Sequence, residues 1–64
     1  MISDLDIWRS ANELIKQFGD TAEIEAAARA DALLDKGDLD GQRVWLRILK
    51  EIDEMQKTPF GKAN

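Results

Sequence analysis

Two glycine–aspartate pairs, Gly19-Asp20 and Gly37-Asp38, divide this chain into three segments with the apolar spacing of amphipathic helices. Glycine adopts the left-handed conformation that ends many helices, and aspartate is a preferred cap for the helix that follows. Pro59 disfavours a helical conformation at Thr58. We therefore predict one domain over residues 1–57, with helices over about 4–18, 21–36 and 39–57, and a C-terminal tail over 58–64.

The residues at the expected helix starts support these boundaries. Ser3 can cap the first helix through its hydroxyl, Asp20-Thr21-Ala22-Glu23 matches a capping box, and Asp38 can cap the third helix. Short connections between amphipathic helices are typical of helical bundles. The sequence therefore predicts an all-α fold, a compact three-helix bundle with very short connections.

Each expected helix carries an apolar stripe when its residues are placed at 100° intervals. Ile24 falls in the broad apolar arc of the second helix. Asp31 at its edge is either an acceptor for a buried tryptophan indole or a solvated surface carboxylate. Gly41 is expected to leave room for a neighbouring side chain. The predicted core residues are Trp8, Ile15, Phe18, Ala30, Leu34, Trp45, Ile48 and Ile52.

Composition narrows the chemistry that this chain can perform. Its 64 residues include no histidine, which is the commonest general base and metal ligand, and no cysteine, so neither a disulfide framework nor a thiolate zinc site can form. The acid–glycine stretch DKGDLDGQRVW suggests a calcium loop, but alignment with an EF-hand puts Lys36 first and Arg47 twelfth, where carboxylates are required. We expect no enzymatic activity, no catalytic residue, no cofactor and no metal site.

Charge and hydropathy bear on the partners. The net charge is −4, which disfavours nucleic-acid binding, and no apolar run approaches the roughly 20 residues that cross a bilayer. We therefore expect a cytoplasmic protein that does not enter the membrane. Two alternatives stay open: a helix-turn-helix-like DNA-binding module using the basic third helix, or an acidic inhibitor of a nucleic-acid-binding protein using Glu25 and Asp35.

Leu39 and Leu46 lie one heptad apart and project away from the main apolar arc of the third helix. They are either covered by neighbouring helices or the tail, or exposed as a contact patch for a protein partner or a second copy. We expect a small protein–protein interaction or regulatory module, with self-association as one form of it. The candidate interface residues are Leu39, Leu46, Arg43, Arg47 and Lys50.

One further pattern extends over about residues 4–57. It consists of Asp6-Ile7-Trp8, Ala11-Asn12, Leu14-Ile15, Gly19, Ala26-Ala27, Arg29-Ala30-Asp31, Leu34, Gly37-Asp38, Gly41-Gln42, Val44-Trp45 and Ile48. In this pattern the chain resembles a family of short, all-helical bacterial proteins of unknown function. The resemblance implies a soluble, stand-alone helical protein with no catalytic residues to transfer.

Overall fold

A computed structural model describes residues 3–57 as an all-α fold whose helices pack against one another. Helix α1 spans Asp4–Phe18, the 3₁₀ turn η1 spans Gly19–Thr21, α2 spans Ala22–Asp35, and α3 spans Leu39–Lys57. The helix ranges lie within one residue of those expected from the sequence. The predicted tail, 58–64, lies outside the described residues.

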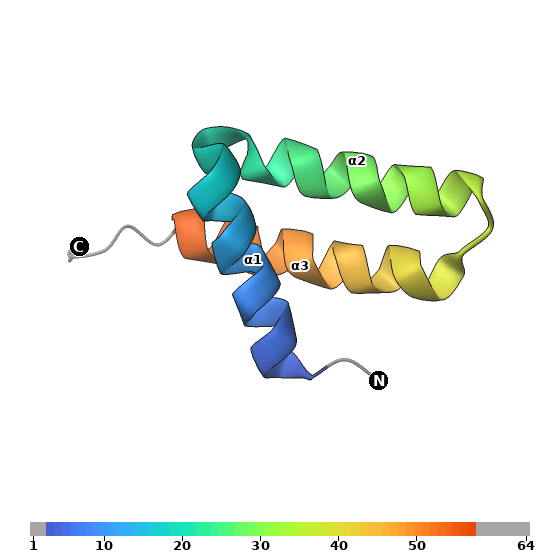
Figure 1. Cartoon of the computed structure of the whole chain (residues 1–64), viewed down its shortest axis with the longest axis horizontal. Helices are drawn as coiled ribbons and strands as arrows, with labels where there is room; N and C mark the ends of the chain where they lie inside the picture. The colour runs from blue at the N-terminus through green and yellow to red at the C-terminus, as the bar shows by residue number, and fades with distance from the viewer. Residues whose placement is uncertain (1–2, 58–64) are drawn as a thin grey trace.

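Helices α2 and α3 form an antiparallel hairpin, and α1 crosses one side of it near the end away from the α2–α3 turn (Figure 1). No residue separates α1 from η1 or η1 from α2, so residues 4–35 can also be described as one long, sharply bent helical segment packed on α3. Because α1 covers only part of the hairpin, the half nearest the turn is a single layer made of α2 and α3.

The bend between α1 and α2 departs from the predicted capping box. Thr21 makes no side-chain cap, and its hydroxyl instead donates to the carbonyl of Phe18 over 2.9 Å. The N–H of Ala22 already donates to the carbonyl of Gly19 within the 3₁₀ turn, so the start of α2 needs a side-chain cap less. Gln56 of α3 also donates to the Gly19 carbonyl over 3.0 Å, which ties the bend to the end of α3.

In the turn between α2 and α3, Asp38 takes part both in the end of α2 and in the start of α3. Gly37 has φ +80°, and the N–H groups of Gly37 and Asp38 donate to the carbonyls of Leu34 and Leu33, both over 2.9 Å. This is the Schellman pattern of a helix C-terminus. The carboxylate of Asp38 then accepts from the N–H of Gly41 over 2.9 Å and caps α3, as predicted.

Gly41 has a different role from the one expected. A Cβ atom added there would lie 2.7 Å from Oδ2 of Asp38, so the missing side chain leaves room for the capping carboxylate rather than for a side chain of another helix. The cap and the glycine therefore belong to one local motif.

Replacing Asp38 with alanine is expected to lower the free energy of unfolding by about 0.5–2 kcal/mol, because the first amides of α3 lose their acceptor. Asp38→Asn is the matched control, since an asparagine oxygen caps about as well as a carboxylate. Urea denaturation of both variants measures the difference. Equal midpoints for the alanine and asparagine variants would contradict this capping role.

The core lies where α1 crosses the hairpin. Helix α1 contributes Ile7, Ala11 and Leu14, α2 contributes Ala22, Ala26 and Ala30, and α3 contributes Ile48 and Ile52. The alanines recur at every fourth position of α2 and form a smooth buried strip, and such small side chains let helix backbones approach closely. Around this centre, the predicted core residues Ile15, Phe18 and Trp45 are half-buried.

Two predicted core residues are exposed. Trp8 keeps 44% of its surface in solvent because it lies at the edge of the α1 stripe, turned about 100° from the buried Ile7. Leu34 keeps 46% because it lies near the turn, where α2 has only α3 as a neighbour. Ile24, placed in the apolar arc of the second helix, is also exposed. A helical wheel identifies the apolar arc, but the number of neighbours decides how much of it is covered.

The expected role of Asp31 as an indole acceptor is also wrong, because Asp31 is exposed. The residue that covers Trp45 is Arg29, whose guanidinium lies over the indole ring at 5.0 Å from its centroid. Glu25 accepts from Nε of Arg29 over 3.0 Å and orients it. A cation over an indole face is a favourable electrostatic contact that also shields the ring from water.

Candidate functional site

The candidate site is the surface of the α2–α3 hairpin on the side opposite α1, here named the back face. On α3, Leu39 and Leu46 lie on the opposite side of the helix from the buried Ile48 and Ile52. They keep 52% and 43% of their surface exposed. The back face consists of Ile24, Ala27, Asp31 and Leu34 from α2, and Leu39, Arg43, Leu46, Leu49 and Lys50 from α3.

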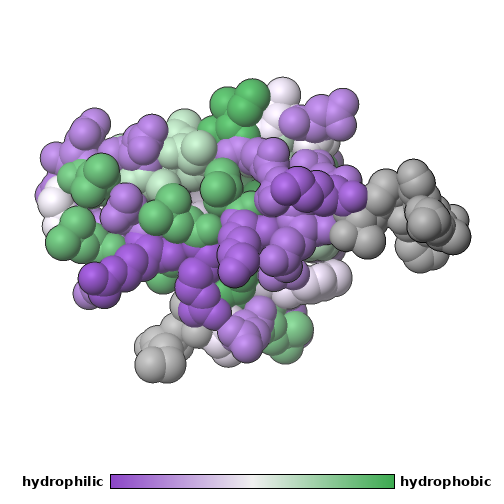
Figure 2. Space-filling view, turned by 180° about the vertical axis from the view of Figure 1, so that it is seen from behind, coloured by the Kyte–Doolittle hydropathy of each residue, from purple (hydrophilic) through white to green (hydrophobic). Residues whose placement is uncertain are grey.

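Helix α2 supplies the apolar half of this surface that the sequence analysis missed. Ile24 is 68% exposed and, with Ala27 and Leu49, lines a shallow groove of about 470 Å³ between the two helices. Leu34 continues the apolar surface toward the turn. Viewed from this side, apolar side chains gather over the half of the hairpin next to the turn, and hydrophilic side chains border them (Figure 2). Together they form a partly apolar surface on two helices, with hydrophilic side chains between the apolar ones.

The missed residues do carry a signal in the sequence. Ile24 and Asp31 are seven residues apart, as are Ala27 and Leu34, so α2 has the same heptad spacing on its back face as Leu39 and Leu46 have on α3. The signal was hidden because Ile24 and Leu34 also fit the broad apolar arc assigned to the core. Only the position of α1 shows that this part of the arc faces solvent.

A pair of carboxyl groups closes the groove at the end away from the turn. A side-chain hydrogen bond between Glu23 and Asp53 raises the pKa of Glu23 above its usual value. The same hydrogen bond, together with Lys57, lowers the pKa of Asp53. Nζ of Lys57 lies 3.1 Å from Oδ2 of Asp53 and stabilises its ionised form. The polar end of the groove is therefore organised by contacts within the chain itself.

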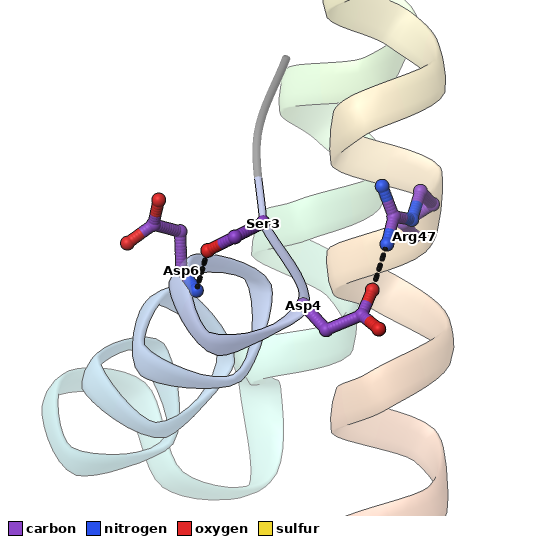
Figure 3. Close-up of polar contacts among 4 residues, drawn as sticks. All are labelled: Ser3, Asp4, Asp6 and Arg47. Carbon is purple, nitrogen blue, oxygen red and sulfur yellow. Dashed lines mark hydrogen bonds and ion pairs between the residues drawn. The ribbon is translucent and has the colours of Figure 1, made fainter.

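Arg47 does not belong to the back face, although it was grouped with the interface candidates. Its Nη2 donates to Oδ1 of Asp4 over 2.6 Å (Figure 3). Asp4 follows the capping residue Ser3, whose hydroxyl accepts from the N–H of Asp6 over 3.1 Å, as the sequence predicted. Because both charged groups are exposed, such an ion pair contributes at most about 1 kcal/mol. Arg47 therefore links the start of α1 to α3.

The charged side chains of the back face are separated by sign between its two helices. Arg43 and Lys50 are on α3, and Asp31 is on α2. The ion pairs within residues 3–57 are Arg29–Glu25, Arg47–Asp4 and Lys57–Asp53, and none of them involves the back-face charges. Apart from Asp53, which is paired with Lys57, the apolar surface is thus bordered by an acid on α2 and by bases on α3.

A second hollow, of about 510 Å³, lies between α1 and α3 beside Trp8. Charged groups of both signs surround it, among them Asp4, Arg47, Lys50 and Glu54. One of its cations is already paired with one of its carboxylates. This hollow offers a single exposed aromatic residue, whereas the back face offers several exposed aliphatic side chains on two helices.

Within residues 3–57, no group of three or more acidic side chains is arranged to hold a metal ion. None of the described helices is long and apolar enough to cross a membrane. No protein-family model matches the chain, and the searches of curated proteins and of solved structures found no match.

Proposed function

We propose that this chain acts by binding another protein through the back face of its α2–α3 hairpin. The observation that carries the proposal is the exposure of four large aliphatic side chains on this one face, Ile24, Leu34, Leu39 and Leu46. Single exposed leucines are common, but contiguous apolar patches bordered by polar residues are typical of interaction sites. The sequence predicts that this binding takes place in the cytoplasm. Membership of the bacterial family stays a prediction.

The charges support a protein partner over the two nucleic-acid alternatives. Of the four basic residues on the outer side of α3, Arg47 pairs with Asp4 and Lys57 pairs with Asp53. Asp38 caps the N-terminus of α3, the end that a recognition helix would bring to the bases. On α2, Glu25 pairs with Arg29, which interrupts the acidic surface that an inhibitor of a nucleic-acid-binding protein would need. We expect no enzymatic activity.

Site-specific photocrosslinking in the native cell tests the proposal. A photoreactive benzoylphenylalanine at Ile24 is expected to form covalent protein adducts of defined mass. The same group at Leu5, which is 55% exposed on α1 and outside the back face, is expected to form none. Adding Leu46→Glu to the Ile24 variant should abolish the adducts, because a charge would then have to be buried in the contact.

Two results would contradict a binding role for the back face. One is the absence of adducts from Ile24. The other is an equal yield of adducts from Leu5, which would show contact without preference for the hairpin. Far-UV circular dichroism of each variant confirms that its helices are intact.

A further inference from the structure

We propose that the partner of the back face is a second copy of this chain, and that two hairpins pair face to face as an all-antiparallel four-helix bundle. This inference rests on the proposed function and adds the identity of the partner. Two-fold pairing requires that a surface be complementary to itself. The back face meets this requirement in both its apolar spacing and its charges.

The apolar spacing suits helix pairing. Leu39 and Leu46 lie seven residues apart on α3, and Leu49 falls at the alternate position of the heptad, while the polar Gln42 and Asp53 occupy the other positions of the same stripe. Ile24, Ala27, Asp31 and Leu34 follow the same pattern on α2. Helices with such stripes pack side by side in four-helix bundles, which have an inclination of about 20° between neighbours. The hairpin already provides two of the four helices.

The charges select one of the two face-to-face arrangements. If α2 of one copy lay on α2 of the other, the acidic borders of the two hairpins would meet each other, and so would the basic borders of the two α3 helices. If α2 instead lies on α3 of the other copy, the acidic border of each hairpin meets the basic border of its partner. Opposite charges across an interface favour association and fix its register, whereas like charges oppose it. The back face is therefore complementary to itself in the second arrangement.

The positions of residues along the hairpin axis, here called their heights, identify which charged residues meet across the interface. Ala27 and Leu49 line the same groove, so four residues further along each antiparallel helix, Asp31 lies level with Trp45. Arg43 is two residues from Trp45, a rise of about 3 Å along the axis. A two-fold axis parallel to the helices preserves these heights and brings Asp31 of one copy over Arg43 of the other. The symmetry generates this pair twice.

Sedimentation equilibrium and light scattering over about 1 µM to 1 mM protein, a range that covers weak and moderately tight association, test the inference. The wild type is expected to be a dimer at the upper end. Leu46→Glu and Ile24→Glu should each be monomers, while Leu5→Glu, an equally exposed position on α1, should leave the dimer intact. The two glutamate substitutions lie on different helices, so unfolding caused by one of them would not explain a monomer in both variants.

Charge reversal tests the arrangement. Asp31→Arg and Arg43→Asp should each weaken self-association by about tenfold or more, because each creates two like-charged contacts per dimer. Mixing the two variants should restore association, since the mixed dimer contains two arginine–aspartate contacts. If α2 lay on α2, position 31 would not face position 43 of the other copy, so mixing the two variants would not restore association.

Each outcome separates this inference from the function on which it rests. A wild type that stays monomeric, or a dimer that Leu46→Glu leaves intact, would overturn the inference. A monomer that still gives Ile24 crosslinks to a different protein would overturn the second copy as partner but leave the binding function standing. A monomer without any crosslink would overturn both.

Discussion

Replacing Ile52 with alanine is expected to lower the free energy of unfolding by about 2–5 kcal/mol. Ile52 is fully buried and is the largest side chain in the described fold that has almost no contact with solvent. Its removal would lose the transfer free energy of the deleted carbons and leave a cavity that surrounding helices fill only in part. A domain of this size has a total stability of only about 5 kcal/mol, so a loss at the upper end of this range would leave a substantial unfolded fraction without denaturant.

Leu5→Ala is the control for this prediction, because Leu5 is more than half exposed and lies outside the back face. Surface substitutions of this kind usually change stability by no more than about 0.5 kcal/mol. Urea denaturation followed by far-UV circular dichroism measures both variants. A midpoint for Ile52→Ala close to that of Leu5→Ala would show that α1, α2 and α3 do not pack around Ile52 as described.

Replacing Ala26 with leucine is expected to destabilise the fold by about 1–3 kcal/mol, by overpacking rather than by a cavity. Ala26 is fully buried in the middle of the alanine strip of α2, where it packs in the core cluster with residues of α1 and α3. The three added carbons would have to displace one of these helices. Alanine and leucine have similar intrinsic helix propensities, so a loss of stability would report packing and not helix formation.

Ala32→Leu provides the comparison within the same helix, since Ala32 is exposed and is turned away from both neighbours. It should leave the urea midpoint almost unchanged. If Ala26→Leu were equally neutral, the close approach of α2 to its neighbours would be contradicted. Heteronuclear NMR spectra of Ala26→Leu would show the same effect as widespread shift changes in residues of all three helices.

Helix α1 covers only one half of the hairpin, and this difference between the two halves bears on both the stability and the proposed function of the fold. Helix α1 crosses the hairpin at the end away from the turn, and the fully buried isoleucine Ile52 lies in that half. Nearer the turn, α2 and α3 pack only against each other, and Leu34 and Leu39 stay exposed. A second copy on the back face would give this half the additional layer that α1 gives to the other. Binding would then stabilise the fold through mass action.

The helices and most of their ends could be predicted from the sequence because the interactions that set them are local. Ser3 reaches an amide three residues ahead, and Asp38 does the same at the start of α3. Gly37 requires only its own left-handed conformation and hydrogen bonds to the last turn of α2. The capping box at Asp20 failed because the competing local structure, a 3₁₀ turn, satisfies the same amides through the backbone.

Part of the candidate site could be predicted for the same reason, and part could not. Leu39 and Leu46 project away from the apolar arc of their own helix, so the periodicity of α3 alone indicates exposure. Ile24 and Leu34 lie within the arc of α2, and their exposure depends on where α1 crosses. Arg47 was assigned to the same surface because its partner, Asp4, lies 43 residues away in the sequence.

By itself, the sequence determined that the chain is helical and, to within one residue, where each helix begins and ends, because these properties depend on contacts within a few residues. It also determined that histidine and cysteine chemistry is absent, because that depends on composition alone. The tertiary structure alone decided which apolar residues are buried, which cations are paired and which face of the hairpin is open. Those outcomes depend on the angle at which α1 crosses α3, and that angle is set by the packing of small and large side chains from all three helices.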